Sequence, residues 1–395
     1  MGKAIATLAG LAAAAVVSAV HASPIGTTWS QFHFNAAHTG ANPQERTLGP
    51  GNVGRLAQAW SRATGAAVES SAAVSGGIVY VGSDDGRLHA YDTANGTERW
   101  VAGLEGESTL VGSPAVAGGA VLVLTSSSLV QAFDATSGAP LWSRPVSAVE
   151  GLFPGSPTVA ANVVYAVVED LAALDTRTGA VLWTRSGAGC FVCSPPVAGG
   201  VLYLGAGPAA GRRLLALDAQ TGAQRWSFKP HVVGDFSWSA SAAVAGGRVF
   251  IAGWATPTRT AKQKAYALYA FDAASGAKQW KLAVGKSKYL TGSSPAVARG
   301  VVYYASPGGR LYAVWAASGK VVWAKKIAVT DSSPAVANGV VYVGAGRAVY
   351  AFGVRNGKKL WSARAAAAMS SSPAVVDGSL YVSSSDGVVH AYRLP

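Results

Sequence analysis

The sequence predicts an all-β protein, an eight-bladed β-propeller with four antiparallel strands in each blade. A unit of about 40 residues recurs along most of the chain, which is the signature of a repeat architecture. Val, Tyr and Trp are frequent, 48 of the 395 residues are glycine, and little of the chain shows the apolar periodicity of a helix. Half of the residues are hydrophobic and 13% are charged. The chain can therefore bury a large core, and this composition excludes a disordered protein.

One repeat, residues 332–361 (SSPAVANGVVYVGAGRAVYAFGVRNGKKLW), shows the strands of a blade most clearly. Four short strand-like runs are separated by Asn-Gly, Gly-rich and Asn-Gly turns. The innermost strand begins with a Ser-containing signature that occurs eight times, at 70–74, 112–116, 155–159, 193–197, 240–244, 293–297, 332–336 and 371–375. Eight tryptophans hold the last position of a unit: Trp60, Trp100, Trp142, Trp183, Trp226, Trp280, Trp323 and Trp361.

The two ends of the repeat region complete one blade together. Trp60 precedes the first unit, and the last unit stops at residues 393–395 without a fourth strand. We therefore expect the strand at 56–60 to be the outermost strand of the last blade, within one domain of residues 55–395. Such closure leaves no exposed sheet edge. A β-helix or an open solenoid is the alternative, but four strands per unit fit a propeller blade better.

The residues before the repeats are of two kinds. Residues 1–22 combine a lysine, an apolar run and small residues at the end, which predicts a secretory signal peptide and an exported protein, periplasmic or extracellular. An uncleaved membrane anchor is the alternative, and no later segment is long enough to span a membrane. Residues 23–54 are expected to form an ordered arm that wraps over the domain. His33 and His38 in this arm are expected to be packed or solvated rather than metal ligands.

Two stretches carry a family resemblance. Residues 90–100 (AYDTANGTERW) and 216–226 (ALDAQTGAQRW) resemble the A-x-D-x-x-T-G-x-x-x-W signature of PQQ-type (pyrroloquinoline quinone) propeller repeats. That family includes quinone-dependent dehydrogenases and the propeller lipoprotein of outer-membrane protein assembly. The Asp accepts hydrogen bonds from its turn, the Gly allows positive φ, and the Trp covers the joint to a neighbouring blade. In the last three blades the Asp is replaced by Trp315, Gly353 and Arg393, so we expect looser turns there.

For a dehydrogenase, the resemblance implies a bound PQQ, a Ca²⁺ ion held by Glu, Asn and PQQ oxygens, a catalytic Asp and a disulfide of adjacent cysteines. This sequence departs from that pattern. No asparagine of the repeats falls in the loops that enter the innermost strands, and the two cysteines are separated by two residues. If the protein is a dehydrogenase, Asp331 or Asp235 is the candidate base, with PQQ and Ca²⁺ as cofactors. Otherwise no cofactor or metal is expected.

One face of the ring is predicted to carry the binding site. Strand alternation places the loops that enter the innermost strands and those that join second to third strands on the same side, here called the loop-rich face. The loop at 253–264 stretches the tryptophan spacing in blade five to 54 residues. Because variable loops on a rigid scaffold commonly carry binding sites, we predict binding at these residues: Trp238, Trp254, Arg259, Lys262, Lys264, Lys286, Lys288 and Tyr289. Solvated connections without a ligand are the alternative.

The cysteines are Cys190 and Cys193, and the chain has no others. In an exported protein they are expected to form a disulfide that closes a small loop. Redox catalysis is the alternative, but a catalytic C-x-x-C would precede a helix, and this one enters a strand.

Charge is distributed unevenly along the chain. Residues 201–365 contain 22 Lys and Arg against four Asp and Glu, whereas residues 23–200 contain eight against 13. One side of the ring should therefore be basic, which suits an anionic polymer or envelope surface. A basic surface that only keeps the protein soluble is the alternative. Nucleic acid is not expected as a partner because no nucleic-acid-binding motif is present.

Two functions from different classes remain. The first is an exported, non-catalytic and monomeric propeller that binds a protein or an anionic envelope or extracellular component through its loop-rich face. The second is a PQQ-dependent dehydrogenase of an alcohol or sugar. The missing asparagine and the irregular loops favour the first function over the second.

Overall fold

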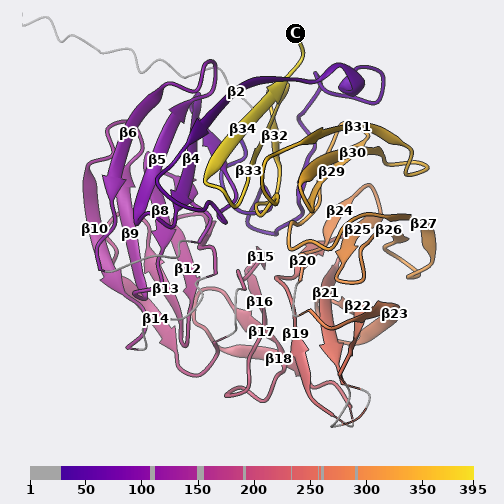
Figure 1. Cartoon of the computed structure of the whole chain (residues 1–395). Helices are drawn as coiled ribbons and strands as arrows, with labels where there is room; N and C mark the ends of the chain where they lie inside the picture. Colours follow the sequence, from indigo (N-terminus) through magenta and orange to yellow (C-terminus); the bar gives the residue numbers. More distant parts are fainter. Residues whose placement is uncertain are drawn as a thin grey trace, which may run out of the picture.

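Eight four-stranded antiparallel units surround a central axis in the computed structural model, as the sequence predicts (Figure 1). The structure describes residues 28–106, 112–148, 155–189, 193–232, 234–256, 258, 262–289 and 292–395. Within these ranges no helix has the length and apolar character needed to cross a membrane. The prediction of an all-β, eight-bladed propeller is confirmed.

Each blade is a meander that runs from the axis outward. The innermost strands are β3 (Ala73–Ser75), β7 (Ala115–Ala117), β11 (Thr158–Ala160), β15 (Val197–Ala198), β20 (Ala243–Ala245), β24 (Ala296–Ala298), β28 (Ala335–Ala337) and β32 (Ala374–Val376). The second strands are β4 (Ile78–Ser83), β8 (Ala120–Leu124), β12 (Val163–Val167), β16 (Val201–Gly205), β21 (Arg248–Ala255), β25 (Val301–Ser306), β29 (Val340–Ala345) and β33 (Ser379–Ser383).

The third strands are β5 (Arg87–Asp92), β9 (Leu129–Asp134), β13 (Leu171–Asp175), β17 (Leu214–Asp218), β22 (Lys264–Asp272), β26 (Arg310–Trp315), β30 (Ala348–Gly353) and β34 (Val388–Arg393). The outermost strands are β6 (Glu98–Gly103), β10 (Pro140–Pro145), β14 (Val181–Arg185), β18 (Gln224–Phe228), β23 (Lys278–Ser287), β27 (Val321–Lys326), β31 (Lys359–Arg364) and β2 (Ala57–Ala63). Three short elements stand outside this scheme: β1 (Ala41–Asn42), the 3-10 turn η1 (Val53–Arg55) and β19 (Phe236–Trp238).

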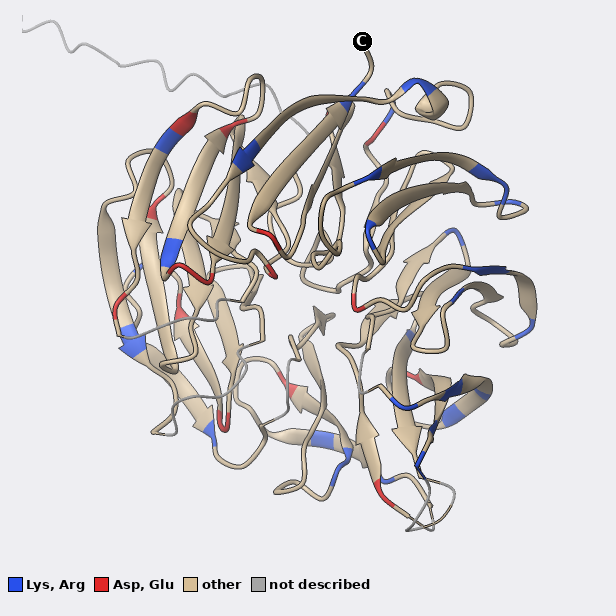
Figure 2. Cartoon of the chain, viewed as in Figure 1, with Lys and Arg blue, Asp and Glu red and all other residues tan. Residues whose placement is uncertain are grey.

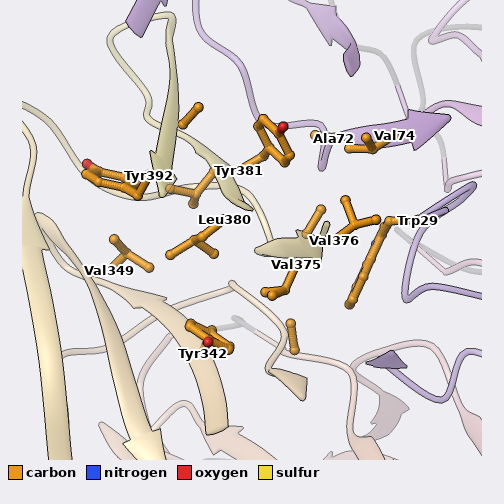
Figure 3. Packing of buried hydrophobic residues seen from close by; sticks show 14 of the residues in the cluster. Trp29, Ala72, Val74, Tyr342, Val349, Val375, Val376, Leu380, Tyr381 and Tyr392 are labelled. Carbon is orange, nitrogen blue, oxygen red and sulfur yellow. The ribbon is translucent and has the colours of Figure 1, made fainter. Parts of the chain in front are cut away.

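The ring is closed by the N-terminal strand, as predicted. Strand β2 pairs antiparallel with β34, so that the first and last strands share blade eight. Figure 3 shows the core at this closure, where Tyr381 and Tyr392 of blade eight lie near Tyr342 of blade seven and Trp29 of the arm packs beside Val376. Second and third strands read as nearly continuous apolar runs because neighbouring blades cover both of their faces.

The eight predicted tryptophans join neighbouring blades. Each indole Nε1 donates a hydrogen bond of 2.8–3.1 Å to a backbone carbonyl of the next blade. The turn glycines have positive φ, and a Cβ on Gly96 or Gly138 would lie 2.6 Å from the tryptophan that packs there. Glycine is therefore needed at the turn for two reasons, the backbone conformation and the space for the indole ring.

The turns that lack the family Asp keep their backbone hydrogen bonds and lose the side-chain acceptor. In blade four, Oδ1 of Asp218 accepts hydrogen bonds from the backbone N–H groups of Gln220 and Thr221. The turns at Trp315 and Gly353 have no such carboxylate, and each is closed by two backbone–backbone hydrogen bonds of 2.9 Å. That these turns are looser stays a prediction.

A ring of serines encircles the channel at the start of the innermost strands. At seven of the eight joints, the N–H of one serine donates to the Oγ of the next blade's serine at 2.8–3.0 Å. The bond from Ser372 to Ser71 connects blade eight to blade one. The eight serines are Ser71, Ser113, Ser156, Ser194, Ser241, Ser294, Ser333 and Ser372.

The N-terminal arm passes through the channel and contacts every blade, whereas the sequence suggested that it wraps over the domain. Seven innermost-strand valines donate their N–H groups to it at 2.7–2.9 Å: Val74, Val116, Val159, Val197, Val244, Val297 and Val336. Blade eight is held in the opposite sense, because Asn42 Nδ2 donates to the Val375 carbonyl. The fit is tight, since a Cβ on Gly40 would lie 2.8 Å from the side chain of Ala296.

Two histidines of the arm are buried as neutral side chains. Nε2 of His38 lies 2.9 Å from Thr158 Oγ1, and Nδ1 of His33 lies 3.3 Å from the His38 carbonyl. Burial lowers the pKa of His33 to about 4, with the His38 carbonyl opposing that shift. Burial also lowers the pKa of His38 well below its usual value, and His33 adds to the effect. The described residues contain no group of three or more His, Cys, Asp or Glu side chains placed to hold a metal.

The serine ring predicts a specific loss of stability. Replacing Ser333→Ala leaves the buried N–H of Ser294 without its acceptor. An unsatisfied buried donor costs about 1–3 kcal/mol, so urea unfolding should show a free energy lower by that amount. Ser362→Ala, on the exposed side of β31, is the matched control and should change stability by less than about 0.5 kcal/mol. Equal effects of both substitutions would contradict a role of the serine ring.

The arm histidines predict a loss of stability in acid. Between pH 6.5 and about 4 the unfolded chain binds a proton at His33 that the folded chain does not, so stability falls as pH falls through this window. The expected contribution is about 2 kcal/mol between pH 7 and pH 5. His33→Asn tolerates the positive φ of 55° at this position and should lose correspondingly less stability over that interval. The same pH dependence in both proteins, measured by urea unfolding, would refute this assignment.

Candidate functional site

A pocket of about 910 Å³ opens on the loop-rich face, above the serine ring. All eight ring serines line it, together with Phe32 of the arm. The Phe32 ring stacks on His33 at 4.6 Å between centroids and meets His38 edge-on at 5.6 Å. The arm therefore contributes Phe32 to the pocket lining, with the buried His33 and His38 packed against it.

Blade five forms an aromatic wall of this pocket. Strand β19 adds to the blade by pairing with the far end of β21, where Phe236, Ser237 and Trp238 lie opposite Ala255, Trp254 and Gly253. Strands β21, β22 and β23 are eight to ten residues long, which carries blade five further than its neighbours. Three of the predicted binding residues, Trp238, Trp254 and Tyr289, line the pocket.

The predicted lysines lie around this wall and outside the pocket lining. Nζ of Lys264 is 5.1 Å from the centroid of the Trp254 ring, and Nζ of Lys288 is 5.3 Å from that of Tyr289. Lys286 lies opposite Ala265 in the pairing of β22 with β23. Both cation–π contacts hold an ammonium group against an aromatic side chain. The structure therefore groups aromatic and basic side chains at the same rim, with the aromatic ones facing inward.

Carboxylates line another part of the pocket. Glu69 and Asp84 belong to blade one, which lies opposite blade five in an eight-membered ring, and Asp331 enters blade seven. Desolvation raises the pKa of Asp84 to about 6, with the charges of Glu69 and Asp85 adding to the shift. Desolvation also raises the pKa of Asp331, Glu69 contributes to the rise, and the N–H of Gly292, at 3.1 Å, opposes it. Negative charge is therefore concentrated in the pocket although the chain as a whole is basic.

The second candidate base, Asp235, is engaged elsewhere. Its Oδ1 lies 3.3 Å from Nη1 of Arg212, and both side chains are well exposed. Arg212 lines the pocket, whereas Asp235 does not contribute to the lining. The structure thus brings Asp331 to the pocket and leaves Asp235 in a solvated ion pair.

Several predicted residues lie outside the pocket or outside the described residues. Lys262 is exposed in the bend before β22. Arg259 and Cys190 lie outside the described residues. Cys193 is buried and disulfide-bonded, and its pairing with Cys190 stays a prediction.

Sequence reasoning missed four contributors to the site: Phe32, Asp84, Arg212 and the serine ring. Phe32 comes from the arm, which has no repeat to place it. Asp84 and Arg212 lie in short turns between second and third strands, where charged residues are common. The serines were visible in every signature, and their spacing of one per blade was the signal that they meet at the axis.

The sequence matches the model of a protein family. The model described as outer membrane protein assembly factor BamB matches residues 51–189 and 169–394. The chain belongs to the BamB-like family of PQQ-type propellers. No curated protein matches the sequence closely enough to show a relationship.

Solved structures similar to this member of the BamB-like family include a BamB protein and dehydrogenases. BamB from Moraxella catarrhalis is 19% identical, with a TM-score of 0.69 over 86% of this chain and 99% of that one. Quinohemoprotein alcohol dehydrogenase from Comamonas testosteroni is 17% identical, with a TM-score of 0.73 over 93% of this chain and 80% of that one. A europium-containing methanol dehydrogenase is 15% identical, with a TM-score of 0.72 over 93% and 98%. At these identities the likeness concerns the fold.

The side chains of the pocket do not suit PQQ. This quinone carries three carboxyl groups, which ionise at neutral pH. Among the described residues, Glu69, Asp84 and Asp331 line the pocket against one cation, Arg212, so the quinone would face like charges in a partly desolvated site. A Ca²⁺ ion would need six to eight oxygen ligands, and the described residues provide no cluster of three acidic or His/Cys side chains for a metal.

We therefore expect that the purified protein retains no PQQ. The protein should be mixed with micromolar PQQ and millimolar Ca²⁺, desalted, and measured for quinone absorbance and for dye reduction with alcohols and sugars. The double variant Glu69→Gln and Asp84→Asn removes two of the opposing charges and serves as the comparison. Stoichiometric quinone absorbance in the unmodified protein would overturn this expectation and restore the dehydrogenase.

Proposed function

We propose that this chain is an exported, non-catalytic and monomeric propeller that binds a protein through its loop-rich face. The contact surface is the rim of blade five together with the pocket beside it. The fold supports a scaffold role, since the repeat residues are used for blade docking and turn formation.

The observation that carries this proposal is the departure of blade five from the repeat. The extra strand β19 and the lengthened strands β21–β23 place Trp254 and Tyr289 at the pocket, and 48% of Tyr289 is exposed. Trp and Tyr are among the residue types that contribute most of the binding energy at protein interfaces. A strand added only for stability would not leave a large aromatic ring exposed.

The family name suggests the class of partner. The matched family model is that of an outer membrane protein assembly factor, so a protein of outer-membrane assembly is the first partner to test. An anionic envelope component, attracted by Lys264, Lys286 and Lys288, is the competing ligand of the same rim. A signal peptide at residues 1–22 would deliver the protein to that compartment.

Site-specific photo-crosslinking in cells of the native host tests the proposal. A photoreactive amino acid at position 254 or 289 should crosslink to one and the same protein in the envelope fraction, whereas positions 95 and 220, in the turns of the opposite face, should not. With that partner purified, Trp254→Ala combined with Tyr289→Ala should weaken binding by at least about tenfold, and 0.3 M salt should weaken it only modestly.

Two outcomes would reject the proposal. Equal crosslinking yields from both faces would show that the loop-rich face is not the contact surface. Absence of a protein adduct, with salt-sensitive retention on an anionic envelope fraction that is lost in the Lys264→Gln, Lys286→Gln and Lys288→Gln variant, would identify the ligand as an anionic component instead.

A further inference from the structure

A second surface, on the outermost strands of blades six and seven, carries a cluster of lysines. Figure 2 shows that Lys and Arg gather over the blades that contain β23, β27 and β31. On the outer rim, a groove of about 490 Å³ follows the joint between blades six and seven. Four lysines line it: Lys325 and Lys326 at the end of β27, and Lys358 and Lys359 at the start of β31. We call this surface the lysine groove.

The lysines of the groove have no carboxylate partner. Within the described part of the chain, none of the four forms an ion pair. In blade four the family Asp of the turn, Asp218, pairs with Arg225 at 2.7 Å, and together with Thr221 this contact lowers the pKa of Asp218 to about 2. In blades six and seven that Asp is replaced by Trp315 and Gly353. The replacement at Gly353 removes the carboxylate of the turn that packs at this joint, whereas the turn at Trp315 packs against Trp280 at the joint of blades five and six.

The groove is built on a rigid part of the ring. Nε1 of Trp323 donates to the Val354 carbonyl at 2.8 Å, which fastens β27 to the turn of blade seven. Cε of Lys325 lies 2.8 Å from the position that a Cβ on Gly357 would occupy, so this side chain lies across the turn. The blade docking contact therefore fixes the backbone on both sides of the groove before any ligand arrives.

We propose that the lysine groove binds a segment of an anionic polysaccharide that carries carboxylate or sulfate groups. All four charged residues are lysines. An ammonium group is a point charge that can pair with a carboxylate or a sulfate group, and it does not have the planar fork geometry of arginine. The aromatic residues of the groove, Tyr350 and Phe352, are partly and fully buried, so no open ring is available for the base stacking that single-stranded nucleic acids require. A linear chain enters a concave groove, whereas a flat membrane surface does not.

The lysine groove is independent of the protein-binding rim. It lies on the outer strands of blades six and seven, while the rim belongs to blade five and the pocket to the loop-rich face. Substitutions in one should leave the other intact. The two proposals can therefore fail separately.

Gly353→Asp provides a variant that should remain folded. The nearest atom to a Cβ at this position is Asn356 Oδ1 at 3.4 Å, which is ordinary contact, and the backbone of Gly353 lies outside the left-handed region. The change restores the carboxylate that the family has in this turn, next to Lys358. It should keep or raise the melting temperature and should also neutralise part of the groove.

The probe is a heparin octasaccharide, and binding is measured by titration calorimetry in 50 mM salt. We expect binding that weakens at least about tenfold in 300 mM salt. Gly353→Asp should weaken it about fivefold, and Lys325→Gln combined with Lys359→Gln should weaken it at least about tenfold. Lys264→Gln combined with Lys288→Gln has the same charge change at the blade-five rim and should bind the probe as the unmodified protein does.

Three results would overturn the proposal. Equal loss of affinity in the groove variant and the rim variant would show that net charge alone attracts the probe. If the protein binds phosphatidylglycerol vesicles more tightly than the octasaccharide, and this binding also depends on Lys325 and Lys359, the ligand is a membrane surface. If the protein binds a DNA duplex more tightly than the octasaccharide, with the same dependence on the two lysines, the ligand is a nucleic acid.

Discussion

The backbone N–H groups of the innermost strands impose the main constraint on this structure. Each blade of the ring is a separate sheet with short edges, and its inner edge faces the channel with backbone N–H groups that need acceptors. Here the arm of residues 28–42 accepts hydrogen bonds from seven of these strands and donates to the eighth. In the serine ring, which precedes the innermost strands, the backbone N–H of one serine donates to the Oγ of the serine in the next blade. The inner strand edges are therefore paired, whereas Nε2 of His33 and Nδ1 of His38 in the arm are buried without a hydrogen-bond partner among the described residues.

This internal pairing separates scaffold from function. Tryptophan docking, turn glycines and serines repeat from blade to blade, and each has a structural partner in the described residues. The features without a structural partner are the additions to blade five and the lysines at the joint of blades six and seven. Both are places where the chain departs from its own repeat, by adding a strand in one case and by losing a carboxylate in the other.

Charge illustrates how the ring distributes its chemistry. The basic excess of residues 201–365 lies on outer strands and on the blade-five rim, whereas the pocket holds three carboxylates and one arginine. A trianionic cofactor would be repelled by the pocket, and an anionic chain would be attracted to the outer rim. The same molecule thus has a pocket with acidic and aromatic side chains on its loop-rich face and the lysine groove on its outer strands.

The sequence by itself determined the blade number, the strand order, the docking tryptophans and the closure by a strand at 56–60, which spans 57–63 in the structure. These features are local or recur at a fixed spacing, so one chain repeats the evidence for them eight times. It also predicted Trp238, Trp254 and Tyr289 as binding residues of the loop-rich face, and the structure places all three in the pocket lining. Only the tertiary structure decided the path of the arm, whose partners are distributed over all eight blades. Only the tertiary structure placed Glu69 and Asp331 in one pocket and Lys325 and Lys359 in one groove, because the packing of blades brings together residues that share no local sequence pattern.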